Sequence, residues 1–115
     1  MHVMCFDQAP SYHADGHFRM SMRQLQGKQA GPSDIVWIGL SIIEPGGGTV
    51  VSAARVEKFY VVVEGALEVS AQIDDSPPTV AVLGVLDSCR IAPGETRRLH
   101  NRSDQLCKVM LVMPN

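Results

Sequence analysis

Residues 45–65 read PGGGTVVSAARVEKFYVVVEG, with a glycine-rich start, two short apolar runs and a closing Glu64-Gly65 pair. On both sides of this stretch, short segments rich in β-branched residues alternate with Pro and Gly, a pattern typical of an all-β sandwich or barrel. The Glu64-Gly65 pair predicts a hairpin tip between strands at 59–63 and 66–73, because glycine supplies the positive φ that such turns need.

The same punctuation delimits the other strands along the chain. We expect a turn at 45–48 that ends the preceding strand, an irregular segment at 1–16 and an exposed loop at 27–34. A closed barrel is favoured over an open sheet, because so many short apolar strands need their edges covered. The remaining strands are expected at 17–26, 36–43, 50–56, 80–83, 88–91, 96–99 and 107–112.

Composition limits the classes of protein to which the chain can belong. A chain of 115 residues with 45% apolar and 19% charged residues is expected to be one globular domain, here a barrel at 17–115 after the irregular start. The net charge of -2 and the scattered basic residues argue against a nucleic-acid partner. Three cysteines without C-x-x-C spacing, no signal peptide and no long apolar run predict a cytoplasmic protein without a membrane partner.

A second segment, at 87–101, reads DSCRIAPGETRRLHN. This segment and residues 45–65 together resemble the paired motifs of the cupin superfamily. The first motif resembles a glycine-rich turn followed by H-x-H, a Glu and a hairpin glycine. The second resembles P-x-G-x-x-H-x-x-x-N, with Ala92 in place of the first Pro. The resemblance implies an all-β cupin barrel (a double-stranded β-helix or jelly-roll). It also implies a homodimer, for which the strand at 17–26 is the candidate contact.

The positions at which cupins carry metal ligands differ here. They fall on Lys58, on Arg97 and on the pair Ser52 and Ala54, or on Val51 and Ala53 if the spacing is longer. None of these residues holds a transition metal. A lysine and an arginine at one centre would also repel a cation. We therefore expect no metal and no other cofactor.

The replaced positions predict a site of different chemistry. Strand alternation places Ser52, Lys58 and Tyr60 on one face, and Arg97 on the inner face of another strand. We predict that these four residues bind a small anionic ligand such as a carboxylate in the barrel mouth. The structural alternative is that Lys58 or Arg97 reaches solvent or pairs with a neighbouring glutamate.

The histidines are candidates for further roles. His13 and His17 stand four apart, so they could share a face of a strand over the barrel mouth and serve as acid–base groups or as an unusual metal site. Alternation within 17–26 puts His17 on the polar face, opposite Met20, and it turns His100 away from Arg97.

Three functions follow as alternatives. The first is a metal-independent barrel that binds a small anionic metabolite. The second is a metal-independent isomerase, cyclase or lyase that acts on a small carboxylate or carbonyl compound, as the resemblance to the epimerases among cupins implies. The third is a degenerate barrel with a structural role in an assembly. The cupin superfamily is functionally broad, so fold alone does not decide among them.

Overall fold

The computed structural model describes residues 1–115 and contains ten β-strands and two short 3-10 helices. None of its helical segments has the length and apolar character needed to cross a membrane. In chain order the elements are η1 (Phe6–Gln8), β1 (Ser11–Tyr12), β2 (His17–Gln26), η2 (Lys28–Ala30), β3 (Val36–Thr49), β4 (Ser52–Ala53), β5 (Lys58–Glu64), β6 (Leu67–Gln72), β7 (Thr79–Leu83), β8 (Ser88–Ile91), β9 (Thr96–His100) and β10 (Cys107–Pro114).

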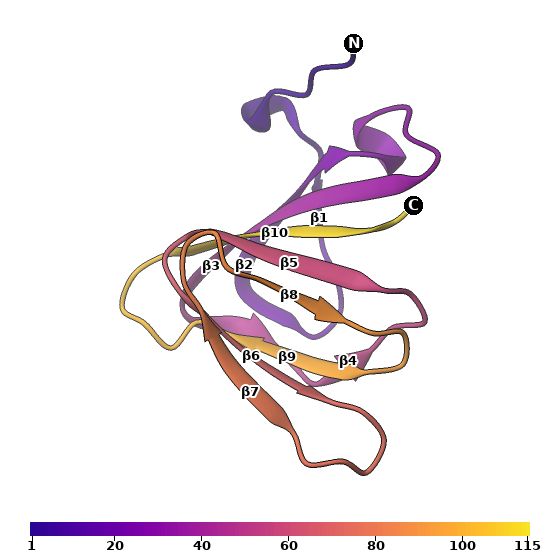
Figure 1. The fold of residues 1–115 in the computed structure, drawn as a ribbon. Helices are drawn as coiled ribbons and strands as arrows, with labels where there is room; N and C mark the ends of the chain where they lie inside the picture. The colour runs from indigo at the N-terminus through magenta and orange to yellow at the C-terminus, as the bar shows by residue number, and fades with distance from the viewer.

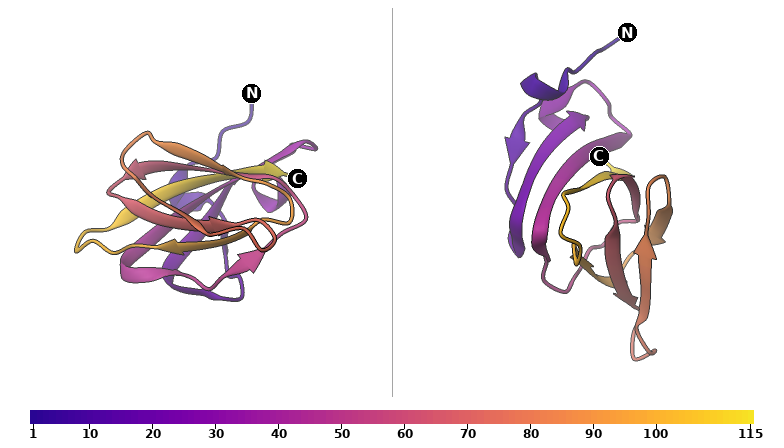
Figure 2. Two further views of the ribbon diagram at one scale, coloured as in Figure 1. Left: turned by 60° about the horizontal axis from the view of Figure 1, so that its bottom comes forward. Right: turned by 90° about the vertical axis from the view of Figure 1, so that its left-hand side faces the viewer.

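The strands form one antiparallel sheet that curls into a nearly closed barrel (Figure 1). The main path through the sheet is β7-β6-β9-β3-β10-β5-β8, and β2 joins it beside β3 with β1 beyond. The right-hand view in Figure 2 shows the N-terminal strands along one side and the orange strands of the second half along the other. The prediction of an all-β barrel is confirmed.

The segment at 45–48 does not end a strand, so the expected turn was wrong. Instead β3 continues to Thr49, pairs with β10 over its first half and reaches β9 at Gly48. The backbone N–H of Gly46 donates to the Asn101 carbonyl at 2.9 Å, so this part of β3 lies directly against the end of β9. A Cβ at Gly48 would lie 2.1 Å from the Leu99 carbonyl oxygen. Only glycine fits here, because a side chain would collide with β9 at the point where β3 crosses from one side of the barrel to the other.

The strand expected at 50–56 is also much shorter than predicted. Only β4 pairs, with Ser52 opposite Arg97 and Ala53 opposite Thr96. After β4 the chain no longer pairs with β9. The Ala54 carbonyl instead accepts a hydrogen bond from the backbone N–H of Gly94 in the β8–β9 turn.

Two further expectations need correction near the N-terminus. Residues 1–16 are not wholly irregular, because Ser11 and Tyr12 pair with β2. The loop at 27–34 contains η2, and its Ala30 is only 1% exposed. The other strands agree with the prediction within two residues at each end.

The core lies between the two sides of the barrel and is built from alternate residues of the strands. Inward-facing side chains from β3, β5, β6, β9 and β10 pack together, which follows from the period of two along a strand. Its fully buried members include Ile43, Val62, Leu67, Leu99, Cys107 and Val109.

A polar anchor at the end of β9 fixes the loop before β10. The fully buried Asn101 donates from Nδ2 to the carbonyls of Ile43 and Gln105, and its Oδ1 accepts from the backbone N–H and the hydroxyl of Ser103. We expect Asn101→Ala to lower the free energy of unfolding by about 2–4 kcal/mol, because buried partners lose their hydrogen bonds. Urea unfolding checks this, with Gln8→Ala at an exposed position as the control.

The edges of β2 matter for the expected dimer. Within the same chain β2 pairs with β3 along most of its length, and β1 covers it at Met22 and Arg23. The stretch from His17 to Ser21 has no strand on that second side. The homodimer through this strand stays a prediction.

Candidate functional site

A cavity of about 270 Å³ opens inside the barrel, next to the core. It is lined from β2, β3, β5, β9 and β10, from η2 and from the segment around β1. Besides its tyrosines, the cavity has six polar lining residues, of which four carry or can carry positive charge and none is acidic. They are His17, Gln24, Lys28, Ser41, Lys58 and Arg97.

Arg97 is the polar centre of this cavity, although its side chain is almost completely buried at 5% exposure. Its Nε donates to the Tyr60 hydroxyl at 2.9 Å. Its Nη1 donates to the Thr49 hydroxyl at 3.1 Å and to the Ser52 hydroxyl at 2.9 Å. The Nη2 group makes no hydrogen bond within the protein, so two N–H donors of a buried cation are available to a ligand.

The local register explains why these groups meet. Tyr60 lies two residues after Lys58 on β5, so both side chains point into the barrel. Ser52 lies opposite Arg97 in the β4–β9 pair. The structure thus brings three of the four predicted site residues, Lys58, Tyr60 and Arg97, to the cavity wall. Ser52 accepts a hydrogen bond from the guanidinium but does not line the cavity.

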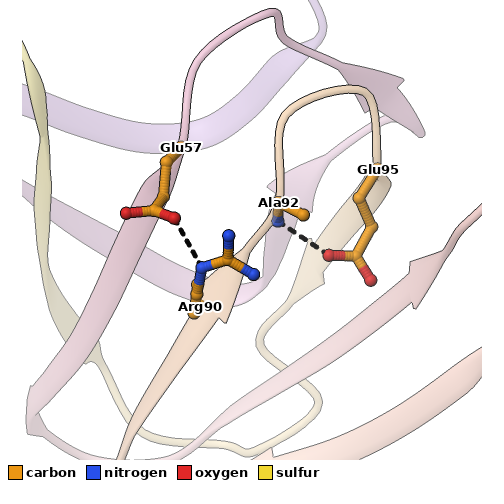
Figure 3. Close-up of polar contacts among 4 residues, drawn as sticks. All are labelled: Glu57, Arg90, Ala92 and Glu95. Atoms are coloured by element: carbon orange, nitrogen blue, oxygen red, sulfur yellow. Dashed lines mark hydrogen bonds and ion pairs between the residues drawn. The ribbon is translucent and has the colours of Figure 1, made fainter.

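The glutamates that could have neutralised Lys58 or Arg97 are bound elsewhere. Glu57 pairs with Arg90 at 2.6 Å, and Glu95 accepts the Ala92 N–H at 2.8 Å (Figure 3). The carboxylates of Glu64 and Glu68 form ion pairs with Lys108 and Arg102, respectively. Neither Lys58 nor Arg97 has a carboxylate partner, so the alternative of an ion pair with a neighbouring glutamate does not hold.

Burial and neighbouring charges shift the pKa values of Lys58 and Tyr60. Burial, then the charges of Arg97 and Lys28, lower the pKa of the Lys58 ammonium. Burial also raises the pKa of the Tyr60 hydroxyl, against the opposing effect of Arg97. Tyr60 therefore keeps its proton at neutral pH, and since its oxygen accepts from Arg97, that proton can be donated to a ligand.

The structure places His17 on the cavity side, which corrects the alternation expected for β2. Arg19 has a φ of +52°, and the pairing with β3 shifts between Phe18 and Met20. This bulge changes the parity of the strand, so His17 shares a side with Met20. His13 is exposed and His100 lies outside the cavity, so the two histidines four apart do not share a site.

Tyr12 and Lys28 are wall residues that the sequence did not single out. Tyr12 reaches the cavity because β1 pairs it with Met22, and burial raises its pKa to about 12. Its ring contacts that of Trp37 edge-on with centroids 5.4 Å apart, and the Lys28 Nζ lies 5.1 Å from the centre of the same indole. Only the β1–β2 pairing could have revealed Tyr12, and two residues are too short a strand to recognise.

The residues of this cavity do not fit a transition metal. The positions expected for the cupin ligands hold no histidine or carboxylate with either spacing, and His17 is the single histidine of the cavity lining. Three cationic side chains, Lys28, Lys58 and Arg97, without a carboxylate make a poor ligand set for a divalent ion. No group of three or more His, Cys, Asp or Glu side chains in the structure is placed to hold a metal.

His17 makes a testable contribution to stability. Burial, followed by the charges of Arg97 and Lys58, lowers its pKa below the ordinary 6.5, although a hydrogen bond from Nδ1 to the Asp15 carbonyl opposes this. The unfolded chain therefore binds more protons just below pH 6.5, so this contribution is present above that pH and is lost as the pH falls through the folded-state pKa.

We accordingly expect the melting temperature of the wild-type protein to fall more between about pH 7 and pH 5 than that of His17→Gln. Thermal unfolding followed by circular dichroism checks this. His13→Gln, at an exposed position, is the control and should follow the wild type. Parallel pH profiles for wild type and His17→Gln would contradict the assignment.

Comparison with known proteins adds to this geometry. No family model matches the sequence. The polyketide cyclase RemF from Streptomyces resistomycificus superposes with a TM-score of 0.81 at 17% identity, over 99% of this chain and 79% of that one. An oxalate decarboxylase from Lactobacillus farciminis, solved as a formate complex, gives 0.83 at 16% identity over all of this chain and 33% of that one. The cupin domain of Drosophila melanogaster CENP-C gives 0.76 at 17% identity, over 95% and 77%.

These structural similarities, all at low identity, show a cupin fold and confirm the predicted resemblance. The similarity in sequence is closer to a Mycobacterium tuberculosis protein named Beta-D-galactosidase Rv1717. It is 41% identical over 106 residues, which cover 92% of this chain and 87% of that protein. The chain has the cupin fold and belongs to the family of this mycobacterial protein.

Proposed function

We propose that this protein binds a small organic anion, with its acid group on Arg97. The observation that carries the proposal is the buried guanidinium of Arg97, which has two free N–H donors and no carboxylate partner. A buried charge without a counter-charge is unfavourable, and a ligand carboxylate at this point would supply one.

The surrounding groups support an anion at the same place. Lys58 and His17 line the same cavity as Arg97, and the charges of Lys58 and Arg97 both act on His17. The Tyr60 hydroxyl lies beside the guanidinium and has a proton to donate. A carboxylate accepting from Arg97 and Tyr60, with Lys58 nearby, would receive both charge and directional hydrogen bonds.

Thermal-shift measurements and calorimetry with a panel of small carboxylates test the proposal. We expect at least one carboxylate to raise the melting temperature, and Lys58→Met to weaken its binding several-fold through the loss of a nearby positive charge. Lys108→Met is the matched control, because Lys108 lies outside the cavity and pairs with Glu64. Stabilisation by no carboxylate in the panel would contradict the proposal.

A second candidate is hydrolysis of β-D-galactosides, favoured by the 41% identity to a protein with that name. Most glycoside hydrolases use two carboxylic residues around the scissile bond, whereas the lining of this cavity holds neither Asp nor Glu. Such an activity here would need other proton donors and acceptors, and Tyr60 and His17 line the same cavity as Arg97.

A chromogenic β-galactoside separates the two candidates. Release of the chromophore by the wild type, with loss of activity in Tyr60→Phe and in His17→Gln, would support the galactosidase. Absence of turnover together with binding of carboxylates would support a binding role. Turnover that is unchanged in both variants would place any hydrolysis outside this cavity.

A further inference from the structure

We infer that the ligand of this cavity is a small organic dianion, with one acid group on Arg97 and a second acid group at Lys58 and Lys28. This inference rests on the proposed function and specifies the charge of the ligand. It depends on the number of cations without a counter-charge in one cavity, and it sets no limit on hydroxyl groups in the ligand.

Three side chains of the cavity lining are cations, and none of them has a counter-charge. Arg97, Lys58 and Lys28 all line the cavity, and the lining contains neither Asp nor Glu. The three ion pairs of the chain lie elsewhere and involve other basic residues. A ligand with a single carboxylate on Arg97 would therefore leave two positive charges of the cavity without an opposite charge.

The strand register shows where Lys58 lies relative to the indole of Trp37. On β10, Val112 pairs with Phe59 of β5, and Met113 pairs with Trp37 of β3. Continuing the β5–β10 register places Lys58 opposite Met113, so its Cα lies two strand spacings, or about 10 Å, from that of Trp37. The Lys58 side chain, which lines the cavity, therefore enters it at the level of the indole.

Lys28 lies beside the same indole, at the mouth of the cavity. Its Nζ is 5.1 Å from the centre of the Trp37 ring, although the residue as a whole is exposed. Arg97 is buried and Lys58 is half-buried, so the three cations follow one another from the interior of the cavity to its mouth. Burial, then the charges of Arg97 and Lys28, lower the pKa of Lys58, which agrees with a position between the other two.

Two other polar groups near Lys28 are hydrogen-bond donors. The indole N–H of Trp37 is buried and has no hydrogen-bond partner within the chain. The Tyr12 ring meets the indole edge-on with centroids 5.4 Å apart, and burial raises the pKa of its hydroxyl to about 12, so this group keeps its proton. An ionised carboxylate only accepts hydrogen bonds, so a second acid group suits these donors. Hydroxyl oxygens of a ligand can accept from the same donors, so a hydroxylated dianion fits as well.

Calorimetry with three charge series tests the inference. Succinate, glutarate and adipate are each compared with their monoamide and their diamide, which keep the shape of the molecule and remove one or both charges. The three chain lengths cover different separations of the two acid groups. We expect at least one dicarboxylate to bind with a dissociation constant at least about tenfold below that of its monoamide, because the second carboxylate meets two cations. This difference should decrease with added salt.

Lys28→Met distinguishes the second acid group from the first. The substitution should raise the dissociation constant of the dicarboxylate several-fold and leave that of the monoamide unchanged, since Arg97 and Lys58 are intact. Lys108→Met is the matched control, because Lys108 pairs with Glu64 outside the cavity. Circular dichroism confirms folding, and Lys28→Gln replaces Lys28→Met if the latter does not fold. Trp37 is the only tryptophan of the chain, so its fluorescence should change when the dicarboxylate binds beside it.

The outcomes separate this inference from the proposed function. Monoamides that bind as tightly as their dicarboxylates in all three series would overturn the second acid group and leave the anion site at Arg97 standing. Unchanged dicarboxylate binding in a folded Lys28 variant would have the same consequence. Diamides that bind as tightly as the acids would overturn the anion site itself. A panel in which no acid binds would overturn both.

Discussion

Arg97→Met is expected to raise the dissociation constant of a bound carboxylate by at least about thirtyfold, corresponding to about 2 kcal/mol or more. The substitution removes two N–H donors and the positive charge from the centre of the cavity, while methionine fills a similar volume. Because Nη2 has no partner within the protein, these donors are not already engaged in holding the fold.

Stability should respond differently from binding. The Thr49 hydroxyl keeps a hydrogen bond from the Leu99 N–H at 3.0 Å when Arg97 is lost, and removing a buried charge that has no counter-charge also removes its desolvation cost. We expect the free energy of unfolding of Arg97→Met to stay within about 1 kcal/mol of the wild-type value.

Calorimetry and urea unfolding measure the two effects on the same sample. Arg90→Met is the matched control, since Arg90 is an exposed arginine of β8 paired with Glu57 outside the cavity. Unchanged carboxylate binding in a folded Arg97→Met would remove Arg97 from the site. A large loss of stability would show that Arg97 serves the fold.

Gly48→Ala should give the largest loss of stability among the single substitutions considered, about 3–5 kcal/mol. The new Cβ would meet the Leu99 carbonyl oxygen at 2.1 Å, and the residue has a φ of +156° that side chains rarely adopt. Neither β3 nor β9 can move away easily, because Gly48 pairs with His100 and the neighbouring Gly47 accepts the Asn101 N–H.

Gly94→Ala isolates the steric part of this effect. Gly94 also has a positive φ, +80°, yet an added Cβ there has nothing within 4 Å. Its cost should therefore be limited to the backbone conformation, about 1 kcal/mol. Urea unfolding of both variants gives the comparison, and equal losses would show that the close approach of β3 to β9 does not matter.

Much of the cupin barrel could be predicted because its signals are local. The hairpin at Glu64-Gly65 depends on one glycine with a φ of +78°. The strands beside it depend on alternation of apolar side chains. The inward direction of Lys58 and Tyr60 follows from the same alternation once the motif has fixed the register.

The predictions from the sequence were wrong where the conformation of a residue depends on contact with a residue far away in the chain. The glycines at 46–48 give the same local signal in a turn as in a bent strand, and contact with Leu99 and Asn101 selects the strand. The bulge at Arg19 reverses the side on which His17 lies, and β2 shows no composition signal for it. Parity arguments fail at such a point because a single extra residue moves every later side chain to the other face.

By itself, the sequence determined the all-β barrel and the positions of its paired motifs, and it predicted residues that hold no metal at the positions expected for the cupin ligands. Those features are properties of residue types at fixed spacings along the chain. Only the tertiary structure decided that Arg97 is buried without a carboxylate and that His17 joins it. It also decided which apolar side chains, such as Met20, Leu99 and Leu111, line the same cavity. Burial and pairing depend on which strands meet across the barrel, and that is set by contacts between residues far apart in the chain.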